Sequence, residues 1–109
     1  MSFTLISAAM AKKMMREHSV TVVDIRDPLA YIAGHIPSAM SLNNDNVDLF
    51  MDEADVYQPL LVYCYHGHNS PSVGRYFASQ GFDDVYSIEG GFDAWRMLDL
   101  VRVDVAEVS

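Results

Sequence analysis

The sequence predicts an α/β fold in which a central parallel sheet of about five strands is covered by helices on both faces. Short apolar or β-branched segments alternate along the chain with segments whose apolar residues recur at helical spacing. Strands separated by helices form right-handed crossovers, which place neighbouring strands in parallel. At 109 residues the chain has the ordinary size of one domain, so we expect a single domain over residues 1–109.

The composition is that of a globular chain with an acidic balance. Lys and Arg number 7 against 15 Asp and Glu, which gives a formal net charge of −8. This charge disfavours binding to nucleic acid or to an anionic membrane surface, so we expect neither partner. The apolar stretches are too short to span a membrane, and we expect no targeting signal. A single cysteine allows no internal disulfide, which favours a reducing, cytoplasmic location.

The first part of the chain predicts a strand, a helix and a second strand. Residues 3–6 form a short strand, and Ser7 then caps a helix that extends to about His18. Residues 20–25 are β-branched or apolar almost throughout, as expected for an interior strand of a parallel sheet. The helix has an apolar stripe that consists of Ala8, Ala11, Met14, Met15 and His18.

The middle of the chain predicts two helices around a brief strand. Asp27 and Pro28 form the cap and first turn of a helix that ends at Gly34. Residues 40–42 form the strand, and either Asn44 or Asp45 opens the next helix. The apolar residues of that helix follow the spacing i, i+3, i+4 and i+7, at Val47, Phe50, Met51 and Ala54.

The next segment combines a buried strand, the only cysteine and a helix start. Residues 60–63 form the strand, and Cys64 opens a six-residue loop. Ser70 and Pro71 then start a helix that stops at Gly81, with the Ser70 hydroxyl as its cap. Ligands of parallel sheets bind beyond the carboxyl ends of the strands, and a helix N-terminus favours negative charge. Cys64 is therefore a candidate thiolate nucleophile, although a lone buried cysteine is also a common inert core residue.

The last part of the chain predicts a strand over residues 85–88 and a final helix after the turn at Gly90 and Gly91. Residues 101–109 alternate weakly between apolar and polar side chains, which fits either an edge strand or an irregular tail. The apolar side of the final helix carries Phe92, Trp95 and Leu98, and Trp95 is expected in the core.

Three ordered stretches resemble the signatures of the rhodanese family. Residues 22–27 (VVDIRD) and 34–39 (GHIPSA) are similar to its amino-terminal signature, and residues 90–95 (GGFDAW) to its carboxyl-terminal signature. Between them, Cys64 opens a six-residue loop before a helix, as the catalytic cysteine of that family does. The resemblance covers essentially the whole chain and is strongest to the single-domain thiosulfate sulfurtransferases. It implies a rhodanese-like fold and transfer of sulfane sulfur through a persulfide.

The resemblance also implies partners and roles for individual residues. The donor is a small sulfur anion such as thiosulfate, which releases sulfite, and the acceptor is cyanide, a thiol or a thioredoxin-like dithiol. The protein is expected to be a monomer or homodimer and to need no cofactor or metal. Cys64 would carry the persulfide. The anion would be held by the backbone amides of Tyr65, His66, Gly67, His68 and Asn69.

The physical basis for these roles is stabilisation of a thiolate. An ordinary cysteine has a pKa near ~8.5 and is mostly protonated at neutral pH, so inward-pointing amides and a helix end must favour the charged form. Gly67 would let the loop turn its amides inward, because glycine tolerates positive φ. Ser70 and Arg75 are secondary candidates, and the alternative for Arg75 is a solvated position on the helix face.

Several polar residues have alternative interpretations. Cys64, His66 and His68 have the spacing of a metal-ligand set, but a closed zinc site requires four ligands and no further pair has suitable spacing. The two histidines could instead contact the substrate or tune the local field. The remaining polar residues are expected to be structural, with Asp24 and Arg26 as a pair and His35 held by a hydrogen bond.

Two rival functions remain. Cysteine-dependent phosphatases use Cys-x5-Arg, in which the arginine grips the phosphate, but the position after the loop is Ser70 here. A non-catalytic rhodanese-like binding module would not need the cysteine, the glycine and the amide-rich loop that this chain retains. We therefore expect an enzyme that transfers sulfane sulfur from thiosulfate through Cys64.

Overall fold

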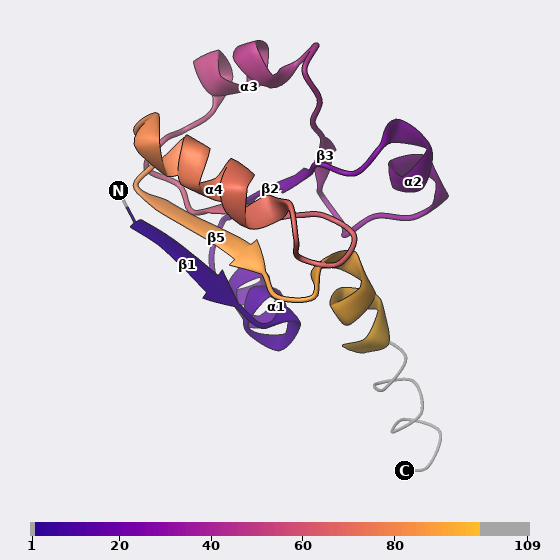
Figure 1. The fold of residues 1–109 in the computed structure, drawn as a ribbon. Coiled ribbons are helices and arrows are strands. Elements are labelled where there is room, and N and C mark those ends of the chain that lie inside the picture. Colours follow the sequence, from indigo (N-terminus) through magenta and orange to yellow (C-terminus); the bar gives the residue numbers. More distant parts are fainter. Residues whose placement is uncertain (1, 99–109) are drawn as a thin grey trace.

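The computed structural model describes residues 2–98 and has the α/β architecture that the sequence predicts (Figure 1). Five strands alternate with helices, and a further helical segment over residues 91–98 follows the last strand. In chain order, the elements are β1 (Ser2–Ile6), α1 (Ala8–Glu17), β2 (Thr21–Asp24), α2 (Pro28–Ala33), β3 (Met40–Ser41), α3 (Val47–Glu53), β4 (Leu60–Tyr63), α4 (Ser70–Ser79) and β5 (Asp84–Ile88).

The five strands form one sheet in the order β1-β5-β4-β2-β3, and every neighbouring pair is parallel. The central strand is β4, with β2 on one side and β5 on the other. In register, Asp24 of β2 lies opposite Tyr63 of β4, and Val62 of β4 lies opposite Ser87 of β5. The predicted parallel sheet is confirmed, and its register brings the ends of three strands to one edge next to Cys64.

The sheet separates two apolar cores, with α1 and residues 91–98 over one face and α3 and α4 over the other (Figure 1). Side chains of a strand point alternately to opposite faces. On β4, Leu61 and Tyr63 belong to the first core, whereas Leu60 and Val62 belong to the second. Cys64 continues this alternation on the face of Val62, where α4 packs.

Helix α1 follows its sequence-based prediction closely. Ser7 is its N-cap and accepts a hydrogen bond from the Met10 amide at 3.1 Å, and the helix ends at Glu17. The interior face is confirmed by the buried Ala8 and Ala11. The prediction that His18 belongs to the apolar stripe is wrong, because this residue follows the helix in an extended conformation and its side chain is exposed.

Helix α3 starts later than predicted, at Val47. The Asn43 side-chain oxygen accepts hydrogen bonds from the amides of Asp45 and Asn46, at 2.8 and 3.1 Å, which holds these residues in a turn. The start at Asn44 or Asp45 is therefore wrong, since an asparagine upstream of both closes the turn with its own side chain. The helix itself packs as expected through Phe50.

Helix α4 ends as predicted but begins differently. Ser70 is its first residue and Asn69 precedes it as the N-cap, without a side-chain capping bond. Gly81 follows the helix with a φ of +107°, as suits a stop position. The predicted cap is therefore wrong, because the Ser70 side chain is buried and directed elsewhere. The segment 101–109, with its two predicted alternatives, lies outside the described residues.

Candidate active site

Cys64 follows the last residue of β4 and its side chain is only 4% exposed. Three polar groups surround its sulfur. The amides of Gly67 and Ser70 donate to Sγ at 3.2 and 3.4 Å, and the Ser70 hydroxyl lies 3.5 Å from it, where it accepts from a neutral thiol and can donate to a thiolate. The loop amide of Gly67 thus points inward as predicted, and the first amide of α4 joins it.

The surroundings of Cys64 act on its pKa in two directions. Burial disfavours the charged thiolate and raises the pKa. The hydrogen bonds from the Ser70 hydroxyl and from the amides of Ser70, Asn69 and Gly67 outweigh burial, so the pKa of Cys64 is lowered from its ordinary value. A thiolate is the nucleophilic form of cysteine, which makes this sulfur suited to attack.

The inward turn of the loop depends on Gly67, whose φ is +85°. A side chain here would also be crowded, because a Cβ at Gly67 would lie 2.8 Å from the Gly90 nitrogen and 3.3 Å from the Ile88 oxygen. L-residues rarely adopt such a φ, so both the backbone and its neighbours favour glycine. The predicted role of Gly67 in turning the loop is confirmed.

A second glycine holds the loop from the other side. Gly91 lies against the backbone of Cys64 and Tyr65, so closely that any Cβ would collide with their carbonyl groups. The amides of Phe92 and Asp93, at the start of the last helical segment, donate to those two carbonyl oxygens at 2.8 and 3.1 Å. The Gly90–Gly91 turn therefore does more than start a helix. Its contacts with the loop were missed in the sequence, where only the GGFDAW signature pointed to them.

The side chains of Tyr65 and His66 contact the surrounding elements rather than the sulfur. The Tyr65 hydroxyl donates to Asp27 at 2.6 Å, and His66 Nδ1 lies 2.7 Å from the Asp93 carboxylate. The ring of His68 lies 6.2 Å from that of His66, between centroids. These predicted site residues, together with the exposed Asn69, form the rim of the loop.

The two secondary candidates differ in their placement. The Ser70 hydroxyl faces Cys64 and also lies 2.6 Å from the hydroxyl of Ser87 on β5, a contact that the sequence analysis did not anticipate. The Arg75 guanidinium instead lies over the Phe3 ring of β1, 5.1 Å from its centroid. We therefore keep Ser70 with the cysteine and place Arg75 on the exposed helix face, as in the alternative above.

The polar pair at the end of β2 is structural, as predicted. Asp24 and Arg26 are buried, and the carboxylate binds the guanidinium at 2.7 Å. The Tyr63 hydroxyl donates to the same carboxylate at 2.6 Å, and burial followed by this hydrogen bond raises the pKa of Tyr63. His35 is held by the Tyr31 carbonyl at 2.8 Å, which confirms its predicted hydrogen bond.

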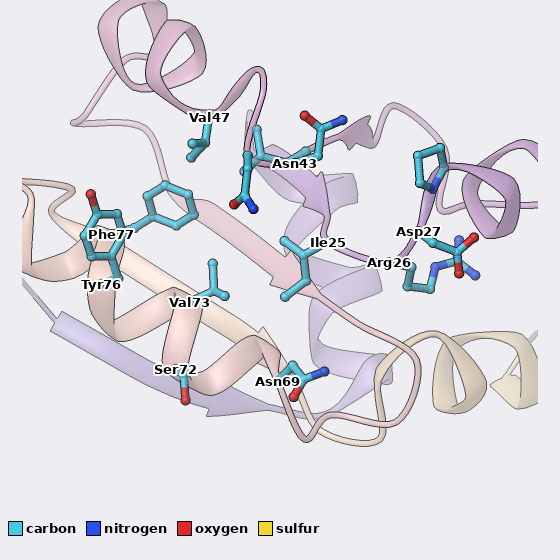
Figure 2. Close-up of a pocket in the computed structure, with 13 residues that line it drawn as sticks. Ile25, Arg26, Asp27, Asn43, Val47, Asn69, Ser72, Val73, Tyr76 and Phe77 are labelled. Carbon is cyan, nitrogen blue, oxygen red and sulfur yellow. The ribbon is translucent and has the colours of Figure 1, made fainter.

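A groove of about 720 Å³ lies beside the loop, between α4 and the segments after β2 and β3 (Figure 2). Asn69, the last residue before α4, lies on its wall, as does Ser72. The groove is wider than a compact sulfur anion requires. Its apolar wall includes Ile25, Leu42, Val47, Val73, Tyr76 and Phe77.

Two further features of residues 2–98 concern metal binding and membrane association. Within residues 2–98, no cluster of three or more histidine, cysteine or acidic side chains could hold a metal ion. In the same part of the chain, no helix has the length and apolar character needed to cross a membrane.

Comparison with known proteins identifies the family. The family model described as "Rhodanese-like domain" matches residues 7–98, a range that contains the three signature stretches and the whole cysteine loop. The chain belongs to the rhodanese family. This assignment agrees with the resemblance that the three sequence signatures indicated.

Named relatives of this rhodanese domain include two bacterial proteins called thiosulfate sulfurtransferase GlpE. The protein from Shewanella oneidensis is 47% identical over 95 residues, which cover 87% of this chain and 94% of the relative. The one from Pseudoalteromonas translucida is 45% identical over 96 residues, which cover 88% and 91%. Among solved structures, a rhodanese-like domain protein from Staphylococcus aureus superposes with a TM-score of 0.74, at 26% identity, and the match covers 84% of this chain and 90% of that one.

Proposed function

We propose that this protein is a thiosulfate sulfurtransferase that carries sulfane sulfur as a persulfide on Cys64. The observation that supports this most directly is the convergence of the Gly67 amide, the Ser70 amide and the Ser70 hydroxyl on one buried sulfur. Such donors favour the thiolate that must attack, and they remain in place for the anionic persulfide that forms. The named relatives are in keeping with this activity.

The proposed reaction has two covalent steps. The Cys64 thiolate attacks the outer sulfur of thiosulfate, and the S–S bond of the donor breaks with its electron pair leaving on sulfite. The product is an enzyme persulfide whose terminal sulfur carries the negative charge. An acceptor nucleophile then bonds to that terminal sulfur, and the Cys64 thiolate leaves with its original electron pair. This is a ping-pong scheme in which no net oxidation of the protein occurs.

The acceptor in this proposal is a thiol or dithiol, with cyanide as a convenient substitute. The groove beside Asn69 supports an acceptor larger than cyanide, because it offers about 720 Å³ next to the loop (Figure 2). Its walls are largely apolar, which suits the organic part of a thiol more than a second small anion.

A phosphatase is the less favoured enzyme. Phosphate dianions are gripped by an arginine fork in cysteine phosphatases, whereas the residue after this loop is Ser70, whose side chain is buried against Cys64 and Ser87. The loop itself carries no lysine or arginine side chain. A non-catalytic binding module is less favoured for a different reason, since it would not require a buried cysteine with a lowered pKa.

The test is to incubate the purified protein with thiosulfate and to measure its intact mass. We expect a gain of one sulfur atom, its removal by cyanide or dithiothreitol, and no gain in Cys64→Ala. Cys64→Ser is a matched control that retains a polar side chain of similar size. The absence of a sulfur adduct with any sulfane donor would contradict the proposal, as would turnover of an aryl phosphate that depends on Cys64.

A further inference from the structure

Two buried serine hydroxyls lie in a row with the sulfur of Cys64. Ser70 begins α4 and Ser87 belongs to β5, and the side chains of both are fully shielded from solvent. Their oxygens are 2.6 Å apart, and the Ser70 oxygen lies 3.5 Å from Cys64 Sγ. Among the described residues, the Ser87 hydroxyl has no other hydrogen-bond partner. The row therefore has one end at β5 and the other at the sulfur.

The number of hydrogens that these three groups share decides the direction of the hydrogen bonds between them. With a neutral thiol, three hydrogens (on Ser87, Ser70 and Cys64) share two links, so one buried hydrogen is left without an acceptor. With a thiolate, two hydrogens fill the two links. Ser87 then donates to Ser70, and Ser70 donates to the sulfur. Because an unpaired buried polar group is costly and hydrogen bonds to a charged acceptor are strong, the ionised sulfur suits the row best.

The opposite direction would leave the site poorly satisfied. If Ser70 donated to Ser87, the sulfur would lose its hydroxyl donor and the Ser87 hydrogen would have no acceptor among the described residues. Ser87 therefore has one favourable role, which is to occupy the acceptor lone pair of Ser70 and leave the Ser70 hydrogen for Cys64. Hydrogen bonds in a chain also polarise one another in the same direction.

We propose that Ser87 is a positioning residue that directs the Ser70 hydroxyl hydrogen onto the sulfur of Cys64. It touches neither the donor nor the acceptor of sulfur and acts only through Ser70. After burial, which opposes ionisation, the Ser70 hydroxyl is the largest influence on the pKa of Cys64, and it lowers that pKa. The inference deepens the proposed function, which needs a thiolate, and it concerns the thiol itself rather than any sulfur substrate.

The test measures the rate of Cys64 alkylation by iodoacetamide as a function of pH. Cys64 is the only cysteine in the sequence, so the alkylation profile reports on this thiol alone. We expect Ser70→Ala to move the midpoint of the profile upward by about one pH unit, and Ser87→Ala by about half a unit. The decisive result is the double variant. Because Ser87 acts through Ser70, the midpoint of Ser70→Ala/Ser87→Ala should equal that of Ser70→Ala.

A matched pair at position 87 separates the hydroxyl from the packing. Ser87→Thr keeps the hydroxyl and Ser87→Val replaces it with a methyl group of nearly the same shape, and both side chains suit a strand. We expect the threonine variant to retain the wild-type midpoint and the valine variant to behave like Ser87→Ala. Ser41→Ala, on the edge strand β3, is the control for a serine substitution that leaves the row intact.

Three outcomes would overturn the proposal. The first is a normal midpoint in Ser87→Ala while Ser70→Ala is shifted. The second is a further shift when Ser87→Ala is added to Ser70→Ala, which would mean that Ser87 acts by packing. The third is a normal midpoint in Ser70→Ala. Because no sulfur donor is used, failure of the proposed sulfurtransferase activity would leave these results unaffected.

Discussion

The ends of β2 and β4 lie side by side at the carboxyl edge of the sheet, and each surrounds a buried group with partners that favour its negatively charged form. At the end of β2, the Asp24 carboxylate is fully buried and is met by the guanidinium of Arg26. At the end of β4, the sulfur of Cys64 is met by two backbone amides and one hydroxyl. The end of β2 is stabilised by a side chain of full opposite charge, whereas the end of β4 is stabilised by dipoles alone.

This difference separates a structural site from a reactive one. The Asp24 carboxylate also accepts the Tyr63 hydroxyl and the Arg26 backbone amide, so its oxygens are occupied by fixed partners. Removing either ion from such a pair leaves an uncompensated buried charge. The donors around the sulfur, in contrast, favour its thiolate form without neutralising it, so the charge of that form is available for making a bond.

The largest expected effect comes from removing the charge of Asp24 at the end of β2. Asp24→Asn keeps the shape of the side chain but leaves the buried Arg26 without its counter-charge. We expect the free energy of unfolding to fall by about 3–5 kcal/mol, measured by urea denaturation. Asp52→Asn, an exposed residue of α3, is the matched control and should change it by less than about 0.5 kcal/mol. Equal effects of the two substitutions would contradict the structural role of the pair.

A smaller effect is expected from a substitution that distorts the backbone of the loop after β4. Gly67→Ala forces a side chain into a φ of +85° and against Gly90 and Ile88, whereas Gly81→Ala meets a φ of +107° in open space. Strain at positive φ costs about 1–3 kcal/mol in both variants. A difference between their rates of Cys64 alkylation therefore isolates the effect of crowding at the loop. We expect Gly67→Ala to lower the alkylation rate of Cys64 at neutral pH more than tenfold, because the inward amide moves. Gly81→Ala should leave that rate unchanged. A normal rate in Gly67→Ala would contradict the amide's role.

The smallest expected effect is the pH dependence of the stability that Cys64 contributes. The pKa of Cys64 is lowered in the folded protein, so the folded state binds its proton less tightly than the unfolded chain does. The stability that this contributes is present above the unfolded value of about 8.5 and is lost as the pH falls through the lowered folded value. The free energy of unfolding of the wild type minus that of Cys64→Ala should therefore rise with pH across this window, which urea denaturation at a series of pH values measures. A decrease would mean that burial outweighs the hydrogen bonds.

The periodic features of the sequence were sufficient to predict the sheet, its parallel strands and the place of Cys64, because these depend on local patterns and on general rules of chain connection. Helix starts were less predictable. The Asn43 side chain closes a local turn over Asp45 and Asn46 that the sequence did not indicate, and the Ser70 side chain faces Cys64 instead of capping α4. The row from Ser87 to Cys64 could not be predicted from spacing, since it depends on the register of β4 and β5 and on the burial of two hydroxyls.

The contacts of Gly91, Phe92 and Asp93 with the loop have a consequence for how the protein is made. The carbonyl groups of Cys64 and Tyr65 are held by amides that come much later in the chain, and Ser87 also follows the cysteine by more than twenty residues. During synthesis, the cysteine therefore leaves the ribosome before the residues that hold its loop in place. We expect the thiol of the nascent chain to react as an ordinary cysteine until the last helical segment has packed against the loop.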